Sequence, residues 1–78
     1  MNGEGILKWI YRDVLERVFD SNLRTMAPAL RVSERTLQKA LDNDAAAESV
    51  LVFEQMMEYC MQHEISVDAI IARYVEGE

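Results

Sequence analysis

Helix-breaking residues are almost absent from the interior of this chain. No glycine occurs between Ile6 and Glu76, and Pro28 is the only proline. β-Branched residues do not alternate with polar ones, as they would in half-buried strands. Apolar residues instead recur three or four positions apart, as they do along one face of a helix. The sequence therefore predicts an all-α fold.

Polar breaks divide the chain into five expected helices, which makes the fold a five-helix bundle. They cover about residues 5 or 6 to 19, 23–30, 34–41, 45–61 and 67–75. Ser33 and Ser66 each precede a helix and are expected to be N-caps, because a serine oxygen accepts a hydrogen bond from a free N–H of the first turn. In the longest helix we expect a buried stripe of Val50, Phe53, Met57 and Cys60 or Met61.

The second expected helix has two possible starting points. If Asn22 is its N-cap, Pro28 lies inside the helix and removes the backbone hydrogen bond to Arg24, at a cost of roughly 3 kcal/mol in a regular helix. If Thr25 is the N-cap, Pro28 lies in the first turn, where the missing N–H has no helical partner to lose. The sequence leaves both starts open.

The length of the chain, 78 residues, predicts a single domain over residues 1–78. A domain of this size buries only about 60% of its unfolded surface, so a second copy that covers more apolar surface would stabilise it. We therefore expect a homodimer.

One cysteine cannot form an intrachain disulfide, and a reducing, cytoplasmic location is the simplest interpretation. The longest apolar run is residues 50–53, too short for a membrane span.

Charge is distributed unevenly along the chain, which has a formal net charge of −6 at pH 7. Residues 22–41 carry four basic residues and one acidic residue, a balance of +3. Residues 42–78 carry nine acidic residues and Arg73, a balance of −8. A basic segment on an acidic body is compatible with an element that contacts DNA, although so short a window can also reach this balance by chance.

The basic segment contains the pattern MAPALRVSERTLQKAL at residues 26–41. Ala27 is a small residue that would let two helices approach each other closely, and Ser33 would cap the second of them. Four apolar residues are spaced to attach both helices to the rest of the fold: Met26, Leu30, Val32 and Leu37.

This segment resembles the Cro/repressor-like, or lambda-repressor-like, helix-turn-helix domains, whose typical text is LA-x-x-LGVS-x-x-T-[IL]. The stretch 41–44 resembles the ENG that follows in that family, and the stretch 65–70 resembles its VSLDEL. Arg31 stands where the family usually has glycine, so this residue is expected to take a positive φ. Leu23 stands where the family often has a glutamine that contacts phosphate, a role that leucine cannot fill.

The resemblance implies a bacterial or phage transcription regulator that binds double-stranded DNA as a dimer. Its recognition helix would run from about Ser33 to Leu41 and present Glu34, Arg35, Gln38 and Lys39 to the major groove. Arg35 would contact guanine and Gln38 would contact adenine. Phosphate contacts would come from Ser33, Thr36, Arg31 and Arg24.

An alternative function uses the other half of the chain. The acidic residues of 42–78 could bind a basic protein partner, with the helix-turn-helix kept as a fold that no longer binds DNA. The sequence contains no phosphate-binding loop and no nucleophile–base pattern, so we expect no enzymatic activity and no cofactor. His63 and Cys60 lack further residues at zinc-ligand spacing, and we expect no metal site.

Overall fold

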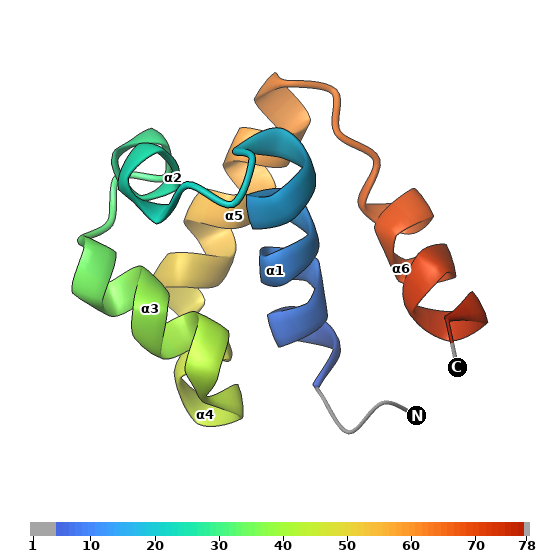
Figure 1. Cartoon of the computed structure of the whole chain (residues 1–78), viewed down its shortest axis with the longest axis horizontal. Helices are drawn as coiled ribbons and strands as arrows, with labels where there is room; N and C mark the ends of the chain where they lie inside the picture. Colours follow the sequence, from blue (N-terminus) through green and yellow to red (C-terminus); the bar gives the residue numbers. More distant parts are fainter. Residues whose placement is uncertain (1–4, 78) are drawn as a thin grey trace.

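The computed structural model describes residues 5–77, and in this part of the chain it contains six helices and no strand (Figure 1). The all-α prediction is therefore confirmed. Residues 1–4 and 78 of the expected domain lie outside the described residues. The helices are α1 (Ile6–Val18), α2 (Leu23–Ala29), α3 (Glu34–Asp42), α4 (Asp44–Ala47), α5 (Val50–Gln62) and α6 (Val67–Glu76).

The predicted count of five helices is wrong because the expected helix over residues 45–61 is two helices, α4 and α5. The side chain of Asn43 caps α4 by accepting hydrogen bonds from the N–H groups of Ala45 and Ala46, at 2.8 and 3.2 Å. At the other end, the carbonyl of Ala47 accepts a hydrogen bond of 2.9 Å from the Tyr11 hydroxyl. A contact with α1 thus replaces the helical bond that this carbonyl would make if the helix continued.

The predicted buried stripe of the longest helix is correct at Cys60 and partly correct at Met57, but wrong at its other positions. The buried residues of α5 are Val52, Met56 and Cys60, and burial raises the pKa of the Cys60 thiol. Among the residues that were predicted to be buried, Val50 is 68% exposed, Phe53 is 38% exposed and Met61 is 80% exposed. Since α5 has apolar residues on two sides, spacing alone did not determine which side faces the core.

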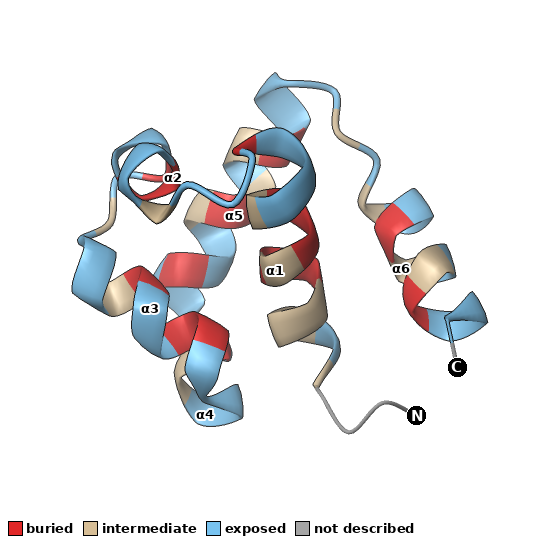
Figure 2. Ribbon diagram, viewed as in Figure 1, coloured by how far each residue is buried: buried red, intermediate tan, exposed pale blue. Residues whose placement is uncertain are grey.

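α1 is the central helix of the fold and lies between α3 and α6 (Figure 1). Its buried side carries Ile10, Tyr11 and Val14, whereas Val18, at the end of the helix, is 41% exposed. Figure 2 shows buried residues on the inward sides of α2, α3 and α5 as well. One cluster of buried residues therefore joins these helices into a single core.

α6 is fixed to α1 by polar and aromatic contacts. The indole N–H of Trp9 donates to the carbonyl of Ile70 at 3.2 Å, and the Trp9 and Tyr74 rings meet edge to face with their centroids 5.6 Å apart. Ser66 caps α6 as predicted, since its hydroxyl oxygen accepts from the N–H of Ala69 at 3.1 Å.

Of the two starting points considered for α2, the structure has the first. The Asn22 side chain accepts a hydrogen bond from the N–H of Thr25 at 3.3 Å, and α2 begins at Leu23. Pro28 therefore lies inside the helix. Both Pro28 and Arg24 are exposed, so the missing helical bond lies on the solvent side, where water can satisfy the Arg24 carbonyl.

Candidate nucleic-acid interface

The turn that joins α2 to α3 covers residues 30–33 and contains the positive φ expected at Arg31, with a value of 60°. The N–H of Arg31 donates to the carbonyl of Pro28 at 3.1 Å, and the N–H of Val32 donates to the carbonyl of Ala27 at 3.0 Å. This pair of bonds is a Schellman motif, in which glycine normally occupies the position of Arg31. The turn is thus closed by backbone bonds despite the absence of glycine.

Buried apolar residues hold α2 and α3 against the rest of the protein. The four positions that the sequence assigned to this role are all withdrawn from solvent: Met26, Leu30 and Leu37 are buried, and Val32 is partly buried. Ala27, the predicted small contact residue, is 1% exposed. α3 also buries Ala40 and Leu41, so one of its faces is fixed inward and the opposite face is left to solvent.

Ser33 caps α3, as predicted, and its hydroxyl group is fully engaged. The oxygen accepts a hydrogen bond from the N–H of Thr36 at 3.0 Å, and the hydroxyl donates to the Thr36 side-chain oxygen at 2.8 Å. A contact from Ser33 to phosphate would have to break the second bond. The hydroxyl proton of the half-buried Thr36 is not used in either bond. Thr36 could therefore donate to a phosphate more readily than Ser33 could.

The exposed face of α3 carries the candidate base-contacting residues. Arg35, Gln38 and Lys39 are all exposed, and their spacing of three and four residues places them on one side of the helix. Glu34 is exposed at the first turn. Arg35 and Lys39 form no ion pair with any of residues 5–77. The two cations are therefore available to an anionic partner.

Gln38 has a partner that the sequence analysis did not identify. Its side-chain amide donates to both carboxylate oxygens of Asp42, each at 3.1 Å. The helix was expected to stop at Leu41, but α3 continues to Asp42, which is exposed like Gln38. The spacing of four residues was a usable signal, because glutamine and aspartate at this distance pair along a helix. Adenine would have to compete with this carboxylate for the Gln38 amide.

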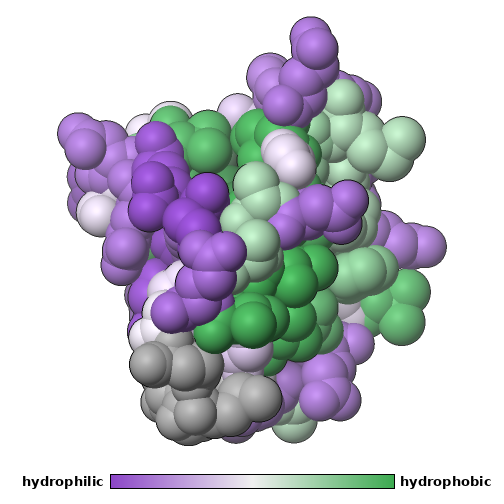
Figure 3. Space-filling view, turned by 90° about the vertical axis from the view of Figure 1, so that its right-hand side faces the viewer, coloured by the Kyte–Doolittle hydropathy of each residue, from purple (hydrophilic) through white to green (hydrophobic). Residues whose placement is uncertain are grey.

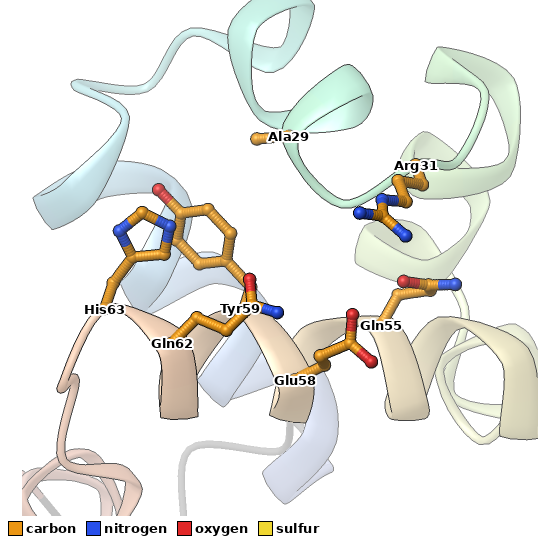
Figure 4. A pocket seen from close by; sticks show the side chains of 7 residues that line it. All are labelled: Ala29, Arg31, Gln55, Glu58, Tyr59, Gln62 and His63. Carbon is orange, nitrogen blue, oxygen red and sulfur yellow. The ribbon is translucent and has the colours of Figure 1, made fainter.

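The two remaining candidate residues lie outside α3. Arg24 is exposed on α2 and makes no ion pair with the described residues. Arg31 lies at the edge of a hollow between the end of α2 and α5, and Figure 4 shows its guanidinium turned towards α5, with Glu58 on the opposite wall. Arg31 is therefore directed partly towards the body of the protein, and not along the exposed face of α3.

The same hollow contains the single histidine of the chain. His63 ends α5 as its exposed C-cap residue, and its ring stacks on Tyr59 with the centroids 4.1 Å apart (Figure 4). No group of three or more His, Cys, Asp or Glu side chains within residues 5–77 is arranged to hold a metal ion. None of the helices in this range is long and apolar enough to cross a membrane.

In comparisons with known proteins, no protein-family model, no curated protein and no solved structure matches this chain.

Proposed function

We propose that this protein binds double-stranded DNA, with α2 and α3 as a helix-turn-helix and α3 as the recognition helix. The observation that carries the proposal is the single exposed face formed by Arg35, Gln38 and Lys39, with both cations free of ion pairs among the described residues. An α-helix fits the major groove of B-DNA, and an arginine there can donate two hydrogen bonds to guanine. Sequence-specific regulation of transcription is the corresponding biological role.

The opposite face of α3 supports this role because it fixes the helix in place. Leu37 and Ala40 are fully buried, and the Ser33 cap fixes the first turn. Side chains on a rigid helix contact bases with a smaller loss of conformational entropy than side chains on a mobile loop. Arg35 is the second residue of α3 and therefore lies near the N-terminal end of this helix. In recognition helices this end contacts the base edges.

The number of contacts available to one copy is small. Arg24, Arg31, Arg35 and Lys39 are the only basic residues between positions 22 and 41. Few phosphate contacts give weak binding, and helix-turn-helix proteins increase affinity by placing two copies on two half-sites about one helical turn of DNA apart. We therefore propose that the DNA-bound form is a homodimer.

The experiment that tests the proposal measures binding to a mixed-sequence DNA duplex by fluorescence anisotropy at about 50 mM salt, where phosphate contacts are strongest. We expect saturable binding that weakens steeply as salt is raised. Arg35→Ala should weaken it, whereas Arg17→Ala removes the same charge from α1, where Arg17 pairs with Asp13, and should change it little. Absence of binding at low salt by the folded protein would contradict the proposal.

A further inference from the structure

One side of α5 is apolar and uncovered. It carries Val50, Phe53, Met57 and Met61, a set we call the outer α5 stripe. Their spacing of three, four and four residues places them along one face of the helix. Val50 and Met61 are 68% and 80% exposed, and Phe53 is 38% exposed. Met57 is partly buried at the edge of the core.

This stripe differs from the scattered apolar residues of an ordinary surface. Single exposed apolar side chains are common, whereas a row of them at helical spacing marks a surface that contacts another molecule. The core uses a different side of α5, through Val52, Met56 and Cys60, and of the stripe only Met57 packs against it. Methionine side chains also adapt to different partner shapes.

A second apolar surface lies on the α6 side of the molecule, where Figure 3 shows hydrophobic side chains among hydrophilic ones. The exposed apolar residues of the helices on that side are Ile6 and Val18 of α1 and Val75 of α6. They come from two helices and do not form a regular row on either. That surface therefore provides a control position, Val75, which is 62% exposed.

The charged side chains that α5 itself places beside the outer α5 stripe are acidic, and Glu58 faces Arg31 across the hollow between α2 and α5. Glu54 lies one turn after Val50, and Glu58 lies one turn before Gln62; both are exposed. Neither forms an ion pair with any of residues 5–77. α5 contains no lysine or arginine, and residues 42–78 have a balance of −8. A partner with cations beside its own apolar row would complement this surface.

The same charges disfavour a second copy of this chain as the partner. If two α5 helices packed antiparallel along their stripes, the glutamates of one copy would face those of the other, and like charges in contact weaken association. We propose instead that the outer α5 stripe binds an amphipathic helix of another protein, whose apolar row is flanked by lysine or arginine. A homodimer on DNA would then use a different surface.

The binding mode follows from the length and spacing of the stripe. An apolar row spaced by three and four residues packs against a second helix as in a short coiled coil, with the flanking charges determining which partner is accepted. Apolar contact along the stripe would provide most of the affinity, and attraction between Glu54, Glu58 and the partner's cations would provide the selectivity. Binding should therefore require both components.

Two synthetic peptides of three heptads each test this proposal on the full chain. Both have leucine at the a and d positions; one has lysine and the other glutamate at the flanking e and g positions. By anisotropy of the labelled peptide, we expect the lysine peptide to bind at least about ten-fold more tightly. The double variant V50S/M61S should lose about ten-fold in affinity for it, whereas V75S should bind as the wild type does.

Three results would overturn the proposal. Equal affinity for the two peptides would mean that the glutamates do not select the partner. Unchanged binding of the lysine peptide to V50S/M61S would mean that attraction between charges alone accounts for the binding. The third result would be that neither peptide binds, and that sedimentation equilibrium shows the wild type as a dimer and V50S/M61S as a monomer. A second copy of the chain would then be the occupant of the stripe.

Discussion

Asp13 and Arg73 lie sixty residues apart in the sequence and form an ion pair in which an Arg73 guanidinium nitrogen donates to the Asp13 carboxylate at 2.7 Å. The Asp13 side chain is only 9% exposed, and its other oxygen accepts a hydrogen bond of 3.0 Å from Arg17. One buried carboxylate of α1 thus pairs with two arginines, and its bond to Arg73 attaches α6 to α1.

Removal of this carboxylate should destabilise the protein. Asp13→Ala leaves Arg73 partly buried without its anion, and its Nε already has no hydrogen-bond partner. Since Arg73 is 37% exposed and water can partly replace the lost contact, we expect a loss of about 1–3 kcal/mol in the free energy of unfolding. Urea unfolding followed by Trp9 fluorescence measures it. The control Glu16→Ala, at an exposed position of α1, should change the free energy by less than about 0.5 kcal/mol.

Removal of the Tyr11 hydroxyl should also weaken the fold. This hydroxyl is buried and donates to the carbonyl of Ala47, which joins α1 to the end of α4. Tyr11→Phe leaves that carbonyl without this donor and should cost about 0.5–1.5 kcal/mol at neutral pH, measured by urea unfolding. Tyr59→Phe is the matched control, because Tyr59 is only partly buried and packs by its ring against Phe19 and His63.

The same tyrosine predicts how stability changes at high pH. Burial raises the pKa of Tyr11 from 10.0 to about 12. Below pH 10 the phenol is protonated in both states, so this group adds no pH dependence. Between pH 10 and about 12 only the unfolded chain releases the proton, which lowers the free energy of unfolding as pH rises, by up to about 3 kcal/mol. The fall in this window should be shallower for Tyr11→Phe; parallel curves for the two proteins would contradict the assignment.

Local patterns predicted most of the helices but not which faces they bury. Caps at Ser33 and Ser66, the small residue Ala27 and the positive φ at Arg31 each depend on a few neighbouring residues, and the structure has all of them. The break between α4 and α5 was missed because it depends on a hydrogen bond from Tyr11, 36 residues away from Ala47. The buried side of α5 was mostly mispredicted because the helix carries apolar residues on two sides, and only contacts with other helices determine which side faces the core.

For the candidate site, the sequence correctly predicted which residues are exposed. It did not predict which of their side chains are already bonded to other residues of the protein. Arg35, Gln38 and Lys39 lie on one exposed face, yet Gln38 is bonded to Asp42 and the Ser33 hydroxyl to Thr36. Arg31, at the turn with a φ of 60°, has its guanidinium turned towards α5 (Figure 4). Such side-chain pairings depend on rotamers and tertiary placement, which spacing alone does not give.

Two arginines should affect DNA binding differently. We propose that Arg35 contacts base edges, so Arg35→Ala should reduce discrimination between a selected site and a mismatched site, at a cost of about 1–3 kcal/mol for the selected site. For Arg24 on α2 we propose a contact with phosphate, so Arg24→Ala should weaken binding to all duplexes to a similar extent. Competition binding with both duplexes measures the two effects. The same pattern of losses for both variants would exclude α3 as the recognition helix.

Replacement of Asp42 by asparagine should strengthen DNA binding several-fold. The carboxylate holds the Gln38 amide and places negative charge on the face proposed to contact an anionic backbone. Asp42→Asn removes that charge and weakens the hold on Gln38, because a neutral acceptor binds an amide less strongly than a carboxylate does. Asp68→Asn makes the same change of charge at an exposed position of α6 and should leave binding nearly unchanged. Equal gains for the two variants would mean that only net charge matters.

Arg31→Gly should change stability and DNA affinity in opposite directions. Glycine adopts a positive φ without the steric cost that Arg31 bears at 60°, so the variant should be more stable by up to about 1 kcal/mol in urea unfolding. It also loses one cation next to α3, so binding to all duplexes should weaken and the salt dependence should fall, by at most the equivalent of about one phosphate contact because the guanidinium is turned partly towards α5. Arg31→Ala separates the two effects, because it removes the charge and keeps the strained backbone. Arg31→Ala should therefore lose affinity for DNA without gaining stability. If Arg31→Ala instead gained as much stability as Arg31→Gly, the charge of Arg31, and not its backbone conformation, would be the unfavourable feature of this turn.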